Sequence, residues 1–336
     1  LMKLLGSPNI ASKIWVYGQY DHEVGIRTVT KPGYDASVLR LDNGKFLSIK
    51  IDGNPKQCYI NPREGAIGCF EEACRNVVCT GAKPIGMLDH LQFGNPNDPE
   101  IFWTFLESLK GLTDFAKDFE IPCVGGKVSL YNETSDGPIK PTPVIGVIGL
   151  IDKKPLKIQK INSGDSLIMI GDTKDELGGS EYSEYIHKFI GGKCPAVDFS
   201  ESKKNMNCVL DIIENELIKS AHDCSKGGLT IAISELCMIN QIGCNVSLEK
   251  IPGEKLDSDK ILFSESHSRY LLTIENKNLS KLEETLKKYG VSYSLIGEFT
   301  GDSICFSSDS KPIIDLSVDK AQKTWFNSLK EMVLHA

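Results

Sequence analysis

The sequence lacks several patterns that would assign a protein to a class at once. It has no uninterrupted apolar run of about 18 residues, the length that a membrane-spanning helix needs. It has no basic and apolar leader before a small-residue cleavage site. Its 11 cysteines form neither a CxxC pair nor a metal-finger spacing, so we expect reduced thiols and no zinc centre. These absences predict a cytoplasmic protein with no membrane partner.

Positive charge is also in short supply. The chain has 38 Lys and Arg residues and 45 Asp and Glu residues, which gives a formal net charge of −7. The acidic residues are spread along the chain. This balance argues against a nucleic-acid partner. The GxxxxGK[ST] pattern of a Walker loop is absent as well. A nucleotide ligand would therefore need local help from lysines, a metal ion or backbone N–H groups.

What is present predicts two globular domains. The chain has 336 residues, of which 40% are hydrophobic and 25% charged. Its composition turns to Lys, Pro and Gln over residues 152–160, where we place a domain boundary. We divide the chain into an entry segment (1–20), a first domain (21–152) and a second domain (153–336). Strands and helices mix without strict βαβ alternation, which favours an α+β fold. The first five residues are typical of the end of a helix, so we expect a longer parent chain.

The most informative stretch covers residues 61–96. Pro62 is tolerated in a first helical turn, and apolar residues recur at helical spacing over 66–79 before Gly81. Glu72 and Asn76 then share one face of this helix. Two oxygen donors on one stripe suit Mg²⁺, although a solvated pair is the ordinary alternative.

A strand-like run over 85–88 follows, and we expect it to end in the polar residues Asp89 and His90 beside that helix face. Earlier in the chain, the hairpin pattern over 36–51 turns at an Asn-Gly pair and places Asp35 at the mouth of its first strand.

The remaining elements follow from periodicity. We expect helices at residues 98–118, 201–218, 230–240, 280–289 and 318–334. We expect strands at residues 142–151, 166–170, 245–248, 268–274, 292–296 and 303–306. Gly125, Gly126 and Lys127 are interpreted as a turn whose backbone could approach an anion, with an ordinary turn as the alternative.

Five stretches, in this order, carry a family resemblance: NPREGAIGCFEEACRNVVCTGAKPIGMLDHLQFGNP, VGGKVSLYNET, GDTKDELGGSEY, HDCSKGGL and LFSESHSRY. They resemble the C-terminal half of the synthetase subunit of phosphoribosylformylglycinamidine synthase, in the aminoimidazole ribonucleotide synthetase-like superfamily. The resemblance extends to the entry segment through SPNIASK and YDHEVGIRTV. It implies an α+β fold whose first domain contributes strands to a shared barrel and whose second domain is an α/β sandwich.

The resemblance also implies a ligase reaction of purine biosynthesis. ATP phosphorylates the amide oxygen of formylglycinamide ribonucleotide, and ammonia then displaces phosphate. The ammonia comes from glutamine through a glutaminase subunit, and a small third subunit bridges the two. The catalytic histidine and most substrate contacts resemble residues of the N-terminal half, so no catalytic residue is assigned in this chain.

Particular residues match the positions of the family's ligands. Those matched to the magnesium of a bound nucleotide are Asp35, Glu72, Asn76 and Asp223. Those assigned to the nucleotide itself are Lys13, Gly125, Gly126, Lys127 and Ser225. For Asp223 the alternative is an N-cap of the following helix. Lys226 stands where the family often carries an acid, and it could alter metal affinity or face solvent.

Three interpretations stay open at this point. The chain could be half of an ATP-dependent ligase, or a non-catalytic half that holds Mg²⁺-nucleotide and stabilises the complete enzyme. It could also act on another substrate, as selenophosphate and thiamine-phosphate kinases of the same superfamily do, although the YNET and DHLQFGNP stretches argue against this. An isolated chain would expose the strands of its first domain, so we expect a homodimer that replaces the missing half.

Overall fold

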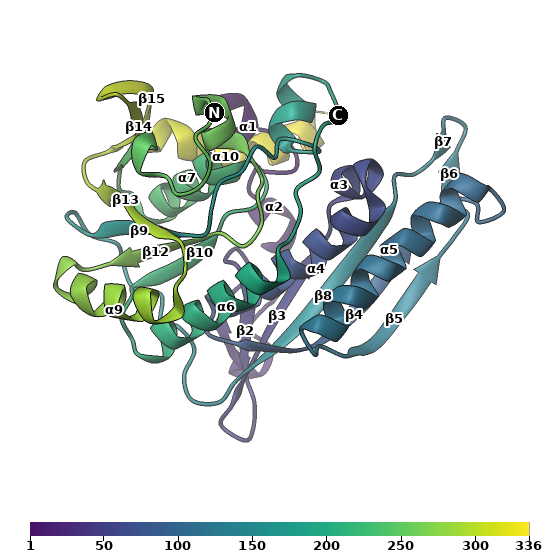
Figure 1. Ribbon diagram of the computed structural model, residues 1–336, viewed down its shortest axis with the longest axis horizontal. Coiled ribbons are helices and arrows are strands. Elements are labelled where there is room, and N and C mark those ends of the chain that lie inside the picture. The colour runs from purple at the N-terminus through teal and green to yellow at the C-terminus, as the bar shows by residue number, and fades with distance from the viewer. Residues whose placement is uncertain (336) are drawn as a thin grey trace.

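The computed structural model describes residues 1–335 and contains two large sheets with helices between and around them (Figure 1). The first sheet has the strand order β1-β2-β3-β8-β4-β5. Its strands are β1 (Thr28–Thr30), β2 (Ser37–Arg40), β3 (Phe46–Asp52), β4 (Lys83–Gln92), β5 (Cys123–Ser129) and β8 (Thr142–Ile151). The accompanying helices are α3 (Pro55–Ile60), α4 (Pro62–Cys79) and α5 (Pro99–Asp118), and β6 (Glu133–Thr134) pairs with β7 (Gly137–Pro138) in a short hairpin.

The second sheet has the order β10-β12-β9-β13-β11-β14-β15. Its strands are β9 (Ser166–Ile170), β10 (Ser220–Asp223), β11 (Cys244–Ser247), β12 (Tyr270–Ile274), β13 (Tyr293–Phe299), β14 (Ser303–Ser308) and β15 (Lys311–Ser317). Its helices are α6 (Phe199–Glu214), α7 (Gly228–Asn240), α8 (Ser258–Phe263), α9 (Leu279–Tyr289) and α10 (Val318–Leu334). The entry segment adds α1 (Met2–Leu5) and α2 (Ile14–Tyr17).

The second domain is a three-layer α/β sandwich because both faces of its central strand are apolar. In β9, Ile168 and Ile170 point into the core that contains α6 and α9, whereas Leu167 and Met169 point into the core that contains α7 and α10. The mixed sheets of the two domains confirm the predicted α+β class.

Helix α4 is the centre of the molecule. Asn61 caps it by accepting a hydrogen bond from the backbone N–H of Glu64, and Pro62 occupies the first turn as expected. Sixteen of its 18 residues are buried. It packs on β3 and β8 of the first sheet and, on its other side, on α6 and β10 of the second domain (Figure 1). One continuous apolar core therefore extends through α4 from one domain into the other.

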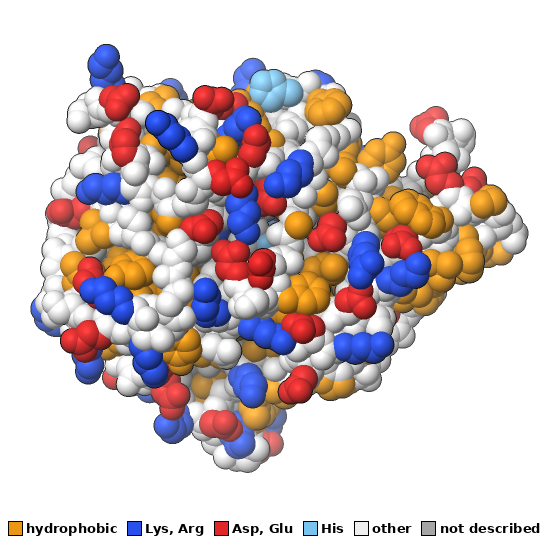
Figure 2. Space-filling model, in the orientation of Figure 1, with side chains coloured by type: hydrophobic (Ala, Val, Ile, Leu, Met, Phe, Trp, Pro, Cys, Tyr) orange, Lys and Arg blue, Asp and Glu red, His pale blue; other side chains and the backbone are white. Residues whose placement is uncertain are grey.

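The two faces of the first sheet differ. Along β8, residues alternate between buried and partly exposed, and Val147 and Ile151 are on the face toward α4. The opposite face leaves Ile51, Leu88 and Val124 between 42% and 66% exposed. Hydrophobic side chains also gather over α5 and near β5, at the right of Figure 2.

The bounds of several predicted elements agree with the structure to within a few residues, and other predictions are wrong. The Asn-Gly hairpin is confirmed, with Gly44 at φ +82°. The strand expected over 85–88 is β4 and continues to Gln92, so Asp89 and His90 lie inside it and do not end it. The turn expected at Gly125, Gly126 and Lys127 is also wrong, because these residues form the middle of the edge strand β5, parallel to β4. Elements that the periodicity did not reveal include α2, α3, α8, β1, β10 and β15 and the short hairpin of β6 and β7.

No helix of the described chain combines the length and the apolar character that crossing a bilayer requires.

Candidate functional site

Three of the four side chains predicted as magnesium ligands, Asp35, Asn76 and Asp223, come together where α4 meets the start of β2 and the end of β10. The carboxylate of the fourth, Glu72, contacts Lys226. Asp35 lies just before β2 and accepts a hydrogen bond from the backbone N–H of Asp223 at 3.1 Å. Asp223 ends β10, and its Oδ2 accepts from Asn76 Nδ2 at 3.2 Å. Asn76 Nδ2 also donates to the carbonyl of Glu72, one turn earlier on α4, at 2.7 Å. The Asn76 nitrogen is therefore engaged, which leaves its side-chain oxygen as the atom that could bind a cation.

His222 is a neighbour of these carboxylates that the sequence analysis did not nominate. Its Nδ1 is 2.8 Å from Asp35 Oδ1 and its Nε2 is 3.2 Å from Glu235 Oε2. Although burial opposes a charged imidazole, these two carboxylates raise the pKa of His222 well above its ordinary value. The possible ligand atoms of Asp35, His222 and Asp223 lie within 4.8 Å of one another. A carboxylate-rich cluster of this kind can hold a divalent cation.

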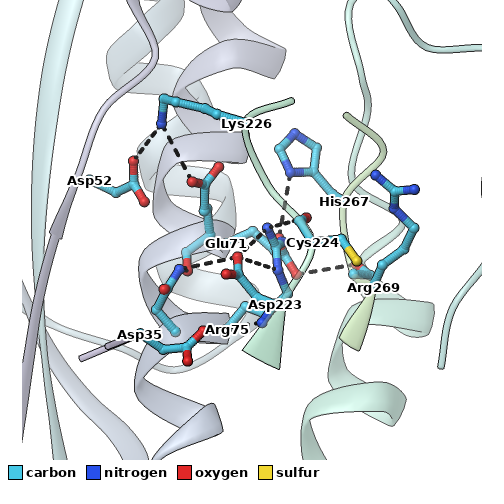
Figure 3. Close-up of polar contacts among 12 residues, drawn as sticks. Asp35, Asp52, Glu71, Arg75, Asp223, Cys224, Lys226, His267 and Arg269 are labelled. Carbon is cyan, nitrogen blue, oxygen red and sulfur yellow. Dashed lines mark hydrogen bonds and ion pairs between the residues drawn. The ribbon is translucent and has the colours of Figure 1, made fainter. Parts of the chain in front are cut away.

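Arg75 is the buried partner of Asp223. Its Nε and Nη2 donate to Asp223 Oδ2 at 3.1 Å and 3.0 Å, and Nη2 also donates to the carbonyl of Cys224 at 3.2 Å (Figure 3). Its Nη1 bonds Glu71, which in turn accepts from Ser268 Oγ at 3.2 Å. Glu71 and Arg75 form an i,i+4 pair that the sequence could have revealed. Together they tie α4 to the second domain and fix the orientation of Asp223.

Lys226 does not face solvent. It lies two residues beyond Cys224, and its Nζ is 3.2 Å from Asp52 Oδ1 and 3.5 Å from Glu72 Oε1 (Figure 3). Although burial would raise the pKa of Glu72, Lys226 and Arg75 hold it below its ordinary value. Although burial disfavours an ammonium, Asp52 and Glu72 raise the pKa of Lys226 well above its usual range.

A buried glutamate holds the loop that carries these residues. Glu265 accepts hydrogen bonds from the backbone N–H groups of Gly227 and Glu181, each at 2.8 Å. Burial raises the pKa of Glu265 to about 7. The N-cap of α7 is Gly227, at φ +79°, so the alternative role of Asp223 as an N-cap is wrong.

Of the residues assigned to a nucleotide, only Ser225 lines the cavity at these carboxylates. This cavity of about 200 Å³ is also lined by Asp35, Lys50, Asn76, His222 and Asp223. Lys13 is exposed and does not line this cavity; its Nζ donates to the carbonyls of Asn9 at 3.2 Å and Ala11 at 2.5 Å, and desolvation of its ammonium lowers its pKa. Gly125, Gly126 and Lys127 are not brought to this cavity. They lie on β5, four strand spacings from β2, which is about 19 Å across the sheet.

A larger cavity of about 600 Å³ lies elsewhere, between the domains near Lys153 and Lys154. Those lysines form exposed ion pairs with Glu214 and Glu216. Because it lacks the converging buried carboxylates, we place the candidate site in the smaller cavity.

Comparison with known proteins matches the two parts of the chain to two separate family models. The model of the AIR synthase related protein N-terminal domain matches residues 33–151, and the model of its C-terminal domain matches residues 162–307. The chain belongs to the AIR synthase related proteins. Within this family, it is similar to phosphoribosylformylglycinamidine synthase subunit PurL of Methanocaldococcus jannaschii, with 43% identity over 99% of this chain and 46% of the relative. The PurL subunit of Alkaliphilus metalliredigens is 40% identical over 98% of this chain and 45% of its own length.

Solved structures support the fold. Thermotoga maritima PurL complexed with FGAR superposes with a TM-score of 0.78 at 19% identity, covering 96% of this chain and 52% of that protein. A HypE-HypF complex chain aligns with a TM-score of 0.62 at 16% identity, covering 84% of this chain and 92% of that one. The chain thus spans a little under half the length of the PurL relatives that it matches.

Proposed function

We propose that this chain is the C-terminal half of a PurL-type synthetase, a ligase of purine biosynthesis. The complete enzyme would convert formylglycinamide ribonucleotide to formylglycinamidine ribonucleotide with ATP and with ammonia from glutamine. The similarity to PurL subunits over 99% of the chain supports this assignment. The convergence of Asp35, Asn76 and Asp223 at one cavity is the observation on which the role of this half depends.

The proposed ligands of a magnesium–nucleotide complex are Asp35, Glu72, Asn76 and Asp223. The residue types fit, because carboxylate and amide oxygens line the cavity and the Asn76 side-chain oxygen accepts no hydrogen bond from the described residues. A bound Mg²⁺ would neutralise phosphate charge. Lys13 and Ser225 would orient the nucleotide from the entry segment and from the loop after β10.

Gly125, Gly126 and Lys127 would serve a different part of the ligand. Their edge strand lies about 19 Å from β2, so one nucleotide phosphate chain at Asp35 would not reach them. We assign them to the open side of the first sheet. There, an N-terminal half would supply the other residues that contact the ligand.

The second candidate is a structural role for the same nucleotide site. Buried ion pairs between Arg75 and Asp223 join α4 to the second domain, and a ligand there would strengthen that joint. Under this alternative, Glu72→Ala in the complete protein lowers the melting temperature far more than turnover. A steep loss of turnover with unchanged melting would argue for chemistry at this site.

Partner subunits follow from the same proposal. Thermotoga maritima PurL has been solved as a PurLQS assembly, which supports a glutaminase subunit and a small bridging subunit as partners of the complete protein. The N-terminal half of the same enzyme would pack on the exposed face of the first sheet.

Phosphate release from ATP tests the enzymatic assignment. The assay combines the purified chain, Mg²⁺, formylglycinamide ribonucleotide and ammonium, with controls that omit each component. Release that depends on the ribonucleotide would place a working site in this half. Silence from a folded chain would favour the structural role.

Magnesium–nucleotide binding can be measured directly by calorimetry. We expect Asn76→Ala to weaken the binding of Mg²⁺-ADP at least about tenfold, because it removes a ligand oxygen and the hydrogen bond that orients Asp223. Asn215→Ala is the matched control, since that exposed asparagine only caps the end of α6. Equal affinities of the two variants would contradict the proposed ligand set.

A further inference from the structure

The acidic cluster has two ends that differ in the cation that contacts their carboxylates. At one end, the Lys226 ammonium contacts Asp52 and Glu72. Lys50 is partly buried and lies between the two ends: it lines the cavity, and although burial opposes its charge, Asp52 and Asp223 help to raise its pKa.

At the other end, Asp35, Asn76 and Asp223 line the cavity. Arg75 contacts Asp223 there, and His222 contacts Asp35 and Glu235. Among the described residues, no lysine ammonium lies within ion-pair distance of Asp35 or Asp223. The cluster of possible ligand atoms also lies at this end.

Lys226 occupies the position that an ion at the first end would need. Its Nζ lies within 3.5 Å of both Asp52 Oδ1 and Glu72 Oε1. Magnesium would have to approach those oxygens to about 2.1 Å and keep several waters, which the ammonium prevents sterically and electrostatically. The side chains of Asp52 and Glu72 are each only 8% exposed, so they cannot turn into solvent to meet another ion.

The position of Lys226 is built into the fold. Its loop follows Asp223 directly, and Glu265 anchors the next residue through the N–H of Gly227. The Lys226 side chain is 26% exposed, whereas Lys153 and Lys154, in surface ion pairs, are 81% and 62% exposed. A fully exposed lysine would contribute little, whereas Lys226 is largely shielded from water and contacts two buried carboxylates directly.

We propose that the Lys226 ammonium is a built-in cation that fills the Asp52–Glu72 end of the cluster and limits the site to one divalent cation. That cation binds at the Asp35–Asp223 end. The inference refines the magnesium–nucleotide site proposed above and rests on it for the first ion. It reassigns Glu72, which holds Lys226 and does not ligate the metal.

Counting bound ions tests this directly. Mn²⁺, which takes the same oxygen ligands as Mg²⁺, is titrated into the purified chain with ADP in equilibrium dialysis. We expect one site-bound ion per chain in the wild type and two in Lys226→Met, which keeps the length of the side chain but removes its charge. Lys226→Arg should stay at one ion. Asp52→Asn combined with Lys226→Met should return to one, because the second ion loses a ligand.

Lys174→Met is the matched control. Lys174 is 28% exposed and pairs with Glu201 at 3.1 Å, so it resembles Lys226 in burial and pairing but lies outside the cluster. It should leave the count at one. Thermal melting confirms that each variant is folded, and Lys226→Gln replaces Lys226→Met if the latter is not.

Each result decides something. Two ions in the wild type, or one ion in both charge-removing variants at position 226, would overturn the inference. No ion in the wild type but one in Lys226→Met would refute the proposed magnesium site while supporting the role of Lys226. No ion in either protein would refute both.

Discussion

At the scale of single residues, the sequence predicted which side chains lie close together better than it predicted their surroundings. Glu72 and Asn76 could be placed on one helical face from spacing alone, and the fold brings Asn76 to Asp223. Arg75 and His222 were missed, because a buried cation has the same sequence signature as an exposed one. Only the fold reveals that Asp223 and Asp35 are their partners.

Glu265 should make stability depend on pH. Its pKa is raised by burial from 4.5 to about 7, so the folded chain binds a proton more tightly than the unfolded chain. Stability from this group is therefore highest at low pH and falls as the pH rises from about 4.5 to about 7, by up to about 3 kcal/mol.

Glu265→Gln isolates this effect, because glutamine can still accept the two backbone N–H bonds without gaining charge. We expect the variant to gain stability relative to the wild type between pH 5 and pH 8 in denaturant titrations, by about 2–3 kcal/mol. A constant difference across that range would show that Glu265 stays ionised throughout.

At the scale of elements, strong periodicity predicted α4, α5, α10 and β8 within one residue or a few, whereas glycine-rich and short segments were misjudged. Gly125 and Gly126 suggested a turn because glycine favours turns. They form a strand because β4 supplies a parallel neighbour, a tertiary contact that local propensity cannot include. In the same way, β10 is only four residues long and depends on β12 for its ladder.

Gly65 should be intolerant of alanine. On helix propensity alone, Gly65→Ala in α4 would gain about 1 kcal/mol. A Cβ there would lie 2.4 Å from the backbone nitrogen of Cys58, which cannot move without displacing α3. We expect a net loss of about 1–3 kcal/mol in the free energy of unfolding.

Gly146→Ala is the control for this prediction, because the nearest atoms to its added Cβ lie 3.9 Å away. Chemical denaturation should show little change for Gly146→Ala. Equal stability of the two variants would mean that α3 and α4 can separate at small cost.

At the scale of the whole molecule, the open face of the first sheet should govern association. Ile51 and Leu88 flank Gly146 on this face and are 66% and 42% exposed. In the chain by itself, a second copy could cover these apolar side chains, so we expect a homodimer in light scattering. Ile51→Lys should shift the chain toward monomer by at least about tenfold in dissociation constant.

Ile313→Lys provides the matching control on the far edge of the other sheet. Ile313 lies on β15 and is 45% exposed, so it resembles Ile51 in chemistry but not in location. It should leave the mass unchanged. A monomeric wild type, or equal effects of the two lysines, would exclude this face as the dimer interface.

The burial of α4 on all sides has a mechanical consequence. Domains joined in one chain often rotate about a hinge to close over a ligand. Here helix α4 is packed between both domains, and the buried ion pair of Arg75 and Asp223 links it to the second domain. Rotation of one domain against the other would therefore expose the shared apolar core to water. We expect the two domains to move and to melt as one body. We expect closure over a ligand at Asp35 to involve the residues just before β1 instead, where Tyr20, Val24 and Ile26 are 71–86% exposed and do not contribute to either core.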